Sequence, residues 1–182
     1  MYITRRSDHN AFIRPNEEKH WMSYATFNWS PWHDEETHTI HALYRAMTKP
    51  DLLASGPSFS VSSIGYTYSN DEEHFTHHEQ FIFSEEEWER YGCEDPRVTK
   101  IGDTYYIFYT ALSTYPFSAE GIKVAIATTK DFKTIDEKKL VTPFNAKAMT
   151  LFPEKINGKF TALLTVDPDK PPSKIAFIQF DS

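Results

Sequence analysis

From residue 92 the chain reads Gly92-Cys93-Glu94-Asp95-Pro96-Arg97-Val98, and it continues as Thr99-Lys100-Ile101-Gly102-Asp103-Thr104-Tyr105-Tyr106-Ile107-Phe108-Tyr109-Thr110-Ala111. The last part is rich in aromatic and β-branched residues, and a polar turn at 101–103 precedes it. The stretch therefore predicts two short strands joined by a turn. Two adjacent carboxylates and an arginine stand at the head of the first strand. This unit is the clearest copy of a repeat, and the repeat predicts the fold.

The rest of the chain shows the same alternating pattern. Short runs rich in Tyr, Phe, Ile, Val and Thr occur at 39–44, 60–68, 105–110, 123–128, 160–166 and 174–180. Helical periodicity is scarce, and its one candidate is the segment 84–91, with Ser84 as the expected N-cap. The sequence therefore predicts an all-β protein.

Three segments align when Pro31, Pro96 and Pro153 are superposed. After each proline we expect a short strand, a polar turn (34–36, 101–103, 156–158) and a second strand (40–45, 105–110, 160–165). The first two units continue into a third strand (61–68, 123–128) and a fourth, edge-like segment (79–83, 139–143). Four strands per repeat are typical of the blades of a β-propeller.

We therefore predict a single partial β-propeller domain over residues 1–182, with approximate blades at 23–83 and 92–143 and an incomplete one at 145–182. Somewhat less than three blades are present, whereas closed propellers have about 4 to 8. An open arc would leave long sheet edges exposed, which natural proteins avoid. We expect the chain to be the N-terminal part of a longer protein, or to need an oligomeric partner that closes the fold.

Composition narrows the classes of partner. The net charge of −7 argues against nucleic acid, because phosphate binding needs a concentrated positive field. Aromatic residues make up 15% of the chain, and a flat apolar ring can stack on a sugar as well as fill a core. No run approaches the ~20 apolar residues that span a bilayer, and no signal peptide stands at the start. With Cys93 as the lone cysteine, we expect a cytoplasmic protein without a membrane partner.

Candidate chemistry lies just before the aligned prolines, because the first strand of each propeller blade lines the central channel. Side chains alternate along a strand, so we expect Asp95 and Arg97 to share one side while Glu94 points to the other. In one interpretation a carboxylate is a general acid and the arginine holds substrate hydroxyls or an anion. In the other, an Asp–Arg pair only stabilises a turn.

The sequence contains no motif that indicates a metal site or a serine nucleophile. Two groups of histidines, one with a glutamate, lack the spacing of a zinc site; they are His33, His38 and His41, and His74, His77, His78 and Glu79. No Gly-x-Ser-x-Gly motif and no phosphate-binding glycine loop is present. We predict neither a metal nor a cofactor.

With these residues in view, the chain resembles glycoside hydrolase family 130, the five-bladed β-propeller mannoside phosphorylases and related β-mannosidases. The carriers of the resemblance are 92–97 with the aromatic strand after it, 125–132, 151–159, and more weakly Phe27-Asn28 and 43–46. They occur in the order of the family. The resemblance implies that this chain is the N-terminal part of such an enzyme.

The resemblance also implies roles. Asp95 would be the proton donor of an inverting reaction on a β-mannoside or a similar short oligosaccharide. Inorganic phosphate would be the co-substrate that attacks the anomeric carbon, so that one enzymic carboxylate suffices. The implied groups that bind substrate or phosphate are Asn28, Arg45, Glu94, Arg97 and Lys147.

Two departures from the family pattern leave phosphorolysis and hydrolysis both open. Phosphorylases of the family usually carry a His-Arg pair where this chain has Leu-Leu-Thr-Val at 163–166, and Trp29 replaces a common proline. Trp29 could stack on a sugar or fill the channel wall. The alternative function is a non-catalytic propeller that binds glycans or proteins. A third option is a relationship to the five-bladed furanosidases. It agrees less well with the sequence, because those enzymes use three well-separated acidic residues, whereas Glu94 and Asp95 are adjacent.

Overall fold

The computed structural model describes residues 11–50 and 59–181, which form three antiparallel sheets and three single-turn 3-10 helices. The first sheet contains β1 (Ala25–Asp34), β2 (Thr39–Met47), β3 (Ser62–Ser69) and β4 (His77–Ile82) in that order. The second contains β5 (Cys93–Ile101), β6 (Thr104–Leu112), β7 (Ile122–Thr129) and β8 (Glu137–Leu140). The third contains β9 (Ala146–Leu151), β10 (Phe160–Val166) and β11 (Lys174–Phe180). The helices are η1 (His20–Met22), η2 (Glu87–Glu89) and η3 (Ala119–Gly121).

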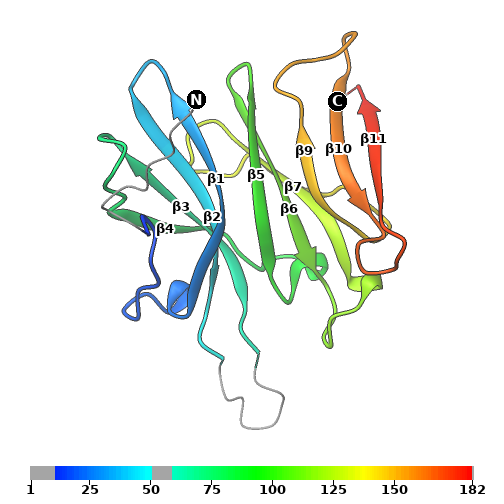
Figure 1. Cartoon of the computed structure of the whole chain (residues 1–182), viewed down its shortest axis with the longest axis horizontal. Coiled ribbons are helices and arrows are strands. Elements are labelled where there is room, and N and C mark those ends of the chain that lie inside the picture. The colour runs from blue at the N-terminus through cyan, green and yellow to red at the C-terminus, as the bar shows by residue number, and fades with distance from the viewer. Residues whose placement is uncertain (1–10, 51–58, 182) are drawn as a thin grey trace, which may run out of the picture.

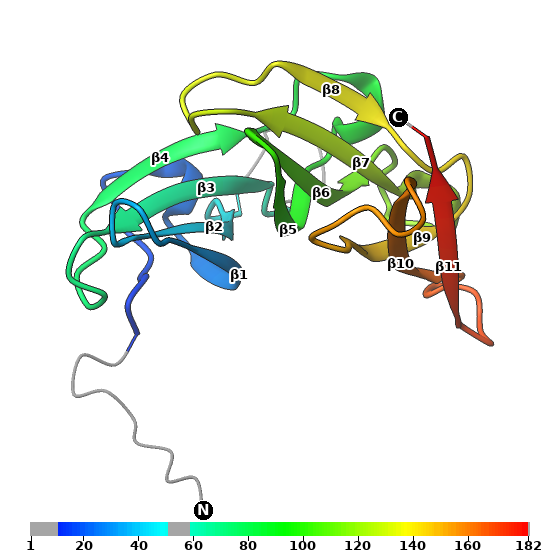
Figure 2. The same cartoon turned by 90° about the horizontal axis from the view of Figure 1, so that it is seen from above.

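The three sheets stand side by side in an arc (Figures 1 and 2). The strands β1, β5 and β9 lie along its concave side, and β4 and β8 lie along its outer side (Figure 2). The all-β prediction is confirmed, and the radial arrangement is that of a β-propeller-like fold. Within the described residues, no helix has the length and apolar character needed to cross a membrane.

The helical candidate at 84–91 is much shorter than predicted. Only η2 forms, and its cap is Glu86, whose backbone N–H donates to the Glu89 carboxylate in a capping box, so Ser84 is not the cap. The Glu89 side chain is completely buried, where it accepts hydrogen bonds from Tyr109 Oη at 2.6 Å and from Lys138 Nζ at 2.5 Å. These long-range partners hold the turn against the second sheet, and the local pattern gives no sign of them.

The alignment on prolines is wrong. Strands β1 and β5 run through Pro31 and Pro96 instead of starting after them, and β9 ends before Pro153. Both strands are edges of their sheets, and an edge strand can lack an N–H donor on its outer side. A β-bulge is the feature that the three units share. In each bulge two residues oppose one on the neighbouring strand, and the first of the two has a positive φ: Asn28 (50°), Asp95 (53°) and Ala148 (52°).

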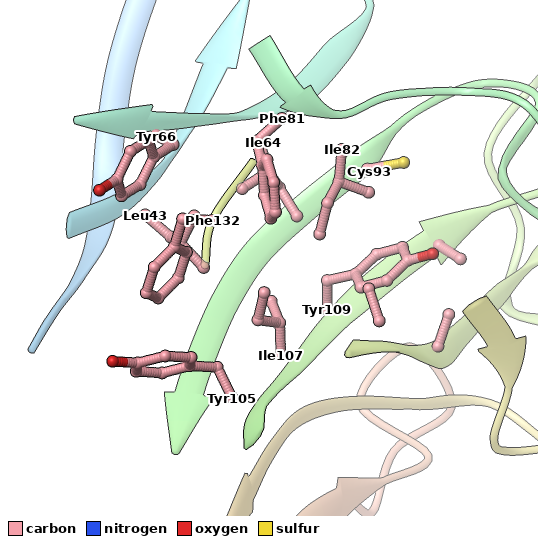
Figure 3. Packing of buried hydrophobic residues seen from close by; sticks show 13 residues of the cluster. Leu43, Ile64, Tyr66, Phe81, Ile82, Cys93, Tyr105, Ile107, Tyr109 and Phe132 are labelled. Carbon is pink, nitrogen blue, oxygen red and sulfur yellow. The ribbon is translucent and has the colours of Figure 1, made fainter. Parts of the chain in front are cut away.

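The core fills the spaces between the sheets. Between the first and second sheets, Phe132 stacks parallel to Tyr66 with ring centroids 4.9 Å apart and packs 4.4 Å from Tyr105 (Figure 3). Aliphatic side chains continue this cluster to Cys93, which burial keeps as a neutral thiol by raising its pKa. A second cluster, which includes Phe108, Met149 and Leu164, joins the second and third sheets. Burial of these faces fixes the inner strands relative to one another.

One face of the third sheet is largely exposed to solvent. Leu163, Ile175 and Phe177 lie on the third sheet with 40%, 73% and 58% of their surfaces exposed. Leu163 pairs with Phe177 across β10 and β11, so these side chains share one face. At the other end of the arc, the outer face of the first sheet is covered by Met22 and Trp21.

Gly92 fixes the approach of the second sheet to the first. Its φ is +139°, and a Cβ there would lie 3.1 Å from the carbonyl oxygen of Ser62, with which Gly92 forms a parallel bridge. We expect Gly92→Ala to lower the free energy of unfolding by about 3 kcal/mol, because this backbone region is essentially restricted to glycine. Gly102→Ala is the control, since Gly102 (φ +63°) has no neighbour within 4 Å and should cost only about 1 kcal/mol. Urea unfolding measures both, and equal losses would contradict the assigned close approach.

Candidate active site

The bulges of β1 and β5 bring Asn28 and Asp95 together. Both residues adopt left-handed backbone conformations, which asparagine and aspartate tolerate better than most residues. The two strands are neighbours (Figure 1) on the concave side of the arc (Figure 2), and Asn28 Nδ2 donates a hydrogen bond of 2.7 Å to Asp95 Oδ1. Each residue is the first of the two bulged residues in its strand. The same local distortion in two neighbouring sheets therefore builds one contact.

Arg45 on β2 joins this pair to Glu94. Its Nη2 forms a close ion pair with Glu94 Oε1, and its Nη1 lies 3.5 Å from Asp95 Oδ1. Its Nε donates to Ser62 Oγ at 3.1 Å, and the guanidinium sits 4.7 Å above the centre of the Phe27 ring. The guanidinium is thus held on several sides, which fixes it in the site.

The predicted alternation of side chains is wrong at the bulge. Glu94 and Asp95 both reach Arg45, although adjacent residues of a regular strand point to opposite faces. The Asp95–Arg97 pair of the structural interpretation is not formed among the described residues, and Arg97 Nη1 donates instead to the carbonyl oxygen of Pro96 at 2.9 Å. The extra residue in β5 turns Asp95 toward β1 and β2.

The two carboxylates of the site differ in environment. Glu94 is 15% exposed and accepts a 3.1 Å hydrogen bond from Ser62 Oγ. Burial raises its pKa above the usual value, although the positive charge of Arg45 opposes this shift. Asp95 is 28% exposed, and its Oδ1 accepts both contacts described above. Within residues 11–50 and 59–181, Asp95 Oδ2 has no hydrogen-bond partner, which leaves it available to a bound molecule.

Lys147 belongs to the same group of inner-strand residues. It pairs with Thr165 just before the bulge of β9, as Glu94 pairs with Thr110 just before the bulge of β5. Its Nζ lies 2.8 Å from Asp169 Oδ1. Its positive charge, like that of Arg45, opposes the rise in the pKa of Glu94 that burial causes. The structure therefore brings together four of the six predicted residues, namely Asn28, Arg45, Glu94 and Asp95. Arg97 is adjacent on β5, and Lys147 lies on the neighbouring inner strand β9.

Trp29 lies away from this group. Its ring stacks against Phe12 at 6.3 Å and meets Phe75 edge-on at 6.0 Å. Its counterparts after the bulges of β5 and β9, Pro96 and Met149, are buried. Trp29 itself is 42% exposed, so the packing on Phe12 and Phe75 does not decide between the wall and the sugar-stacking interpretations.

Several histidines of the two groups contact neighbouring side chains of other types. His74 contacts Asp71 at 2.7 Å, His77 contacts Glu79 at 2.8 Å, and His41 contacts Tyr66 at 2.7 Å. In the part of the chain that the structure describes, no three His, Cys, Asp or Glu side chains gather as metal ligands would.

Two residues of the site escaped the sequence analysis. Ser62 holds both Arg45 and Glu94, and Asp169 holds Lys147. Ser62 lies far from both partners in the sequence; the pairing of β3 with β2 brings it near Arg45, and the bridge to Gly92 brings it near Glu94. Asp169 follows β10 in a loop with no periodic pattern, so no local signal marks it.

A family model for β-1,4-mannooligosaccharide phosphorylases of glycoside hydrolase family 130 matches residues 23–173. The chain belongs to glycoside hydrolase family 130. The family match spans all three sheets, from the residues just before β1 to the loop just before β11. The resemblance carried by the Glu-Asp-Pro-Arg segment is thereby confirmed.

Among family-130 proteins, the chain is 40% identical over 131 residues to a β-1,2-mannobiose phosphorylase of Listeria innocua, covering 71% of this chain and 36% of that protein. It is 31% identical over 170 residues to a 1,2-β-oligomannan phosphorylase of a Thermoanaerobacter species, covering 93% and 55%. The solved Listeria innocua β-1,2-mannobiose phosphorylase, in complex with β-1,2-mannobiose, superposes with a TM-score of 0.74 at 24% identity, covering 97% of this chain and 62% of that one. The chain thus spans about a third to just over half the length of these curated relatives.

Proposed function

We propose that this protein acts in the inverting phosphorolysis of β-mannosides, with β-1,2-linked mannobiose or oligomannan as the first substrates to test and Asp95 as the proton donor. The observation that carries the proposal is the contact of Asp95 with Asn28 and Arg45 on the concave side of the fold. The names of the relatives support the substrate class. Asn28, Arg45, Glu94, Arg97 and Lys147 are the proposed binding groups.

In the proposed reaction Asp95 gives its proton to the glycosidic oxygen, directly or through a sugar hydroxyl, as the bond from that oxygen to the anomeric carbon breaks. An oxygen of hydrogen phosphate forms the new bond at the anomeric carbon from the opposite face. The products are α-mannose 1-phosphate and the shortened sugar, and the phosphate ester returns a proton to Asp95. Phosphate replaces the activated water of an inverting hydrolase, so one carboxylate is enough.

Within this proposal, Arg45 has a supporting role in addition to binding. Its guanidinium is already paired with Glu94, and it holds both carboxylates at fixed positions. Asn28 restrains Asp95 Oδ1, so the unpartnered Oδ2 is the oxygen that we assign to proton transfer. Fixed donors and acceptors of this kind reduce the reorganisation that the reaction requires.

Hydrolysis is the second candidate, and a specific observation favours it. The region 163–166 supplies no cationic donor, and Lys147 and Arg45 are already paired with carboxylates. A phosphate dianion would therefore find fewer charge-assisted hydrogen bonds than a cluster of free cations offers. In that case water would replace phosphate, with a base that lies outside the residues assigned above.

Product analysis distinguishes these reactions. The full-length protein is incubated with β-1,2-mannobiose, with and without inorganic phosphate, and the products are followed by ³¹P and ¹H NMR. We expect α-mannose 1-phosphate in the presence of phosphate only. Mannose alone in both samples would establish hydrolysis instead. Binding of the sugar without turnover in either sample would favour the non-catalytic alternative.

We also propose that further strands complete the ring of blades, supplied by this protein or by an oligomeric partner. Among the described strands β11 pairs only with β10, and the side chains of Leu163, Ile175 and Phe177 are exposed; both observations support this proposal. A groove of about 620 Å³ between the second and third sheets supports it too, with Ile126 and Phe160 in its lining. Their counterparts between the first two sheets, Tyr66 and Tyr105, enclose the ring of Phe132 from the turn after β7. An apolar side chain from the turn after β11 would fill the groove in the same way.

Hydrogen–deuterium exchange tests this completion. In the functional assembly we expect the amides of β11 that point away from β10 to exchange slowly, because a neighbouring strand would accept their hydrogen bonds. The outward amides of β8, which forms the outer edge of the second sheet, are the control and should exchange fast. Equal, fast exchange at both edges in the active protein would contradict a strand on β11.

A further inference from the structure

Asp169 lies in the loop between β10 and β11, where it contacts two residues at the head of β9. Its Oδ1 lies 2.8 Å from Lys147 Nζ. Its Oδ2 accepts a 3.0 Å hydrogen bond from Asn145 Nδ2, and its backbone N–H donates to Asn145 Oδ1 at 3.2 Å. Both carboxylate oxygens are therefore in use, and the side chain has one fixed orientation.

Asn145 anchors this loop. It is 5% exposed, and its Nδ2 also donates to the carbonyl oxygen of Ile122 in the second sheet at 3.2 Å. Its own carbonyl oxygen accepts from the backbone N–H of Asp167 at 3.0 Å. A buried amide that is satisfied on every side ties the loop to the second and third sheets at once. The position of the Asp169 carboxylate is therefore set by the core of the fold.

We propose that Asp169, held by Asn145, is a positioning residue that aims Lys147 at the concave site. A lysine side chain has four rotatable bonds and loses about 2 kcal/mol of conformational free energy when it is fixed. Because the ion pair with Asp169 already restrains the lysine side chain, most of this conformational free energy is lost before substrate binds. Lys147 remains 32% exposed, so its ammonium can still donate to a bound hydroxyl or anion. This role rests on the proposed function.

The ionisation state of Asp169 agrees with its contact with Lys147. Burial works against ionisation of Asp169, but the hydrogen bonds from Lys147 and Asn145 and the charge of Lys147 outweigh it, so the pKa of Asp169 lies below its usual value. The carboxylate is therefore charged at neutral pH. The alternative is a purely structural pin that holds the loop and has no effect on the site.

Kinetics with matched variants separate the two roles. We expect Asp169→Ala to lower kcat/KM about tenfold, mainly through KM, because a displaced binding group loses its orientation. Asp169→Asn keeps an acceptor for Asn145 and should lose less. Lys170→Ala is the control, because Lys170 belongs to the same loop and pairs with Glu120 instead. It should match the wild type, and the Tm of each variant should fall by no more than about 4 °C.

The decisive comparison is made in the Lys147→Met background. If Asp169 acts through Lys147, Asp169→Ala should cause no further loss of kcat/KM there. A full additional tenfold loss in that background, or wild-type kinetics for Asp169→Ala alone, would overturn the positioning role while leaving the proposed function intact. Calorimetric titration with β-1,2-mannobiose repeats the comparison for binding alone. A wild-type protein that neither binds nor cleaves the sugar would overturn the positioning role and the proposed function together.

Discussion

Asp95→Asn should lower kcat on the β-mannoside about 10³-fold, within the range that a general acid contributes. Asparagine is nearly isosteric, and its carbonyl oxygen can accept the hydrogen bonds that Asn28 and Arg45 now give to Oδ1. It has no carboxylic proton to give. We therefore expect the loss to appear in turnover, while the Tm stays within about 3 °C of the wild type.

The control for this variant is Asp103→Asn. Asp103 lies in the turn after β5, where it pairs with Lys130 on the surface, so the same chemical change is made outside the site. We expect its turnover to equal that of the wild type. If Asp95→Asn instead kept normal turnover and lost stability, the Asp95 carboxylate would have a structural role. The non-catalytic function, binding of glycans or proteins, would then be favoured.

Arg45→Met should damage both stability and activity. The variant leaves the Glu94 carboxylate, 15% exposed, without its cation, and removal of one partner of a buried ion pair is strongly destabilising. We expect the free energy of unfolding to fall by about 3 kcal/mol, and kcat/KM to fall at least about 100-fold because both carboxylates lose a fixed partner. Urea unfolding and steady-state kinetics measure these effects.

The stability loss of Arg45→Met should depend on pH. Burial already raises the pKa of Glu94, and loss of the guanidinium removes a cause that lowers it. The folded state then binds a proton at Glu94 more readily than the unfolded state, so stability falls as pH rises through that pKa and recovers as pH falls below it. Arg45→Met combined with Glu94→Gln should be more stable than Arg45→Met alone at neutral pH. A loss that does not change with pH, and that Glu94→Gln does not reduce, would contradict this account.

The control is Lys130→Met, which breaks an exposed pair with Asp103 in place of the buried one. Exposed pairs contribute about 0–1 kcal/mol, so little change is expected.

The strands were predictable because their side chains alternate. The runs at 105–110 and 123–128 became β6 and β7, whose two faces pack toward the first and the third sheet. The gathering of Asn28, Arg45 and Asp95 followed from the family resemblance and agrees with the observed geometry. The strands were thus predictable from the local sequence pattern, and the contact of these three residues was predictable from the motifs of the family.

The bulges were not predictable from alternation. An inserted residue moves the following side chains to the opposite face, so Glu94 and Asp95 both contact Arg45, although alternation placed them on opposite sides. The alignment on prolines did not reveal the bulges, because the three prolines stand at different distances from them. Pro31 and Pro96 lie within β1 and β5, and Pro153 lies after β9. Asparagine and aspartate at the bulged positions were the one available signal, since both tolerate positive φ.

The partners Ser62 and Asp169 were missed for a different reason. Ser62 is positioned by the pairing of β3 with β2 and by the bridge to Gly92, and Asp169 is positioned by the buried amide of Asn145. Both depend on contacts between segments far apart in the chain. No spacing in the sequence carries that information.

The most direct test of the central claim compares two leaving groups in wild-type and Asp95→Asn full-length protein. Mannobiose needs a proton on its departing oxygen, whereas 2,4-dinitrophenyl β-mannoside releases a phenolate that needs none. If Asp95 is the proton donor, the variant should lose about 10³-fold in turnover of mannobiose and recover most of that loss on the dinitrophenyl substrate. An equal loss on both substrates would contradict the assignment of Asp95 as the acid.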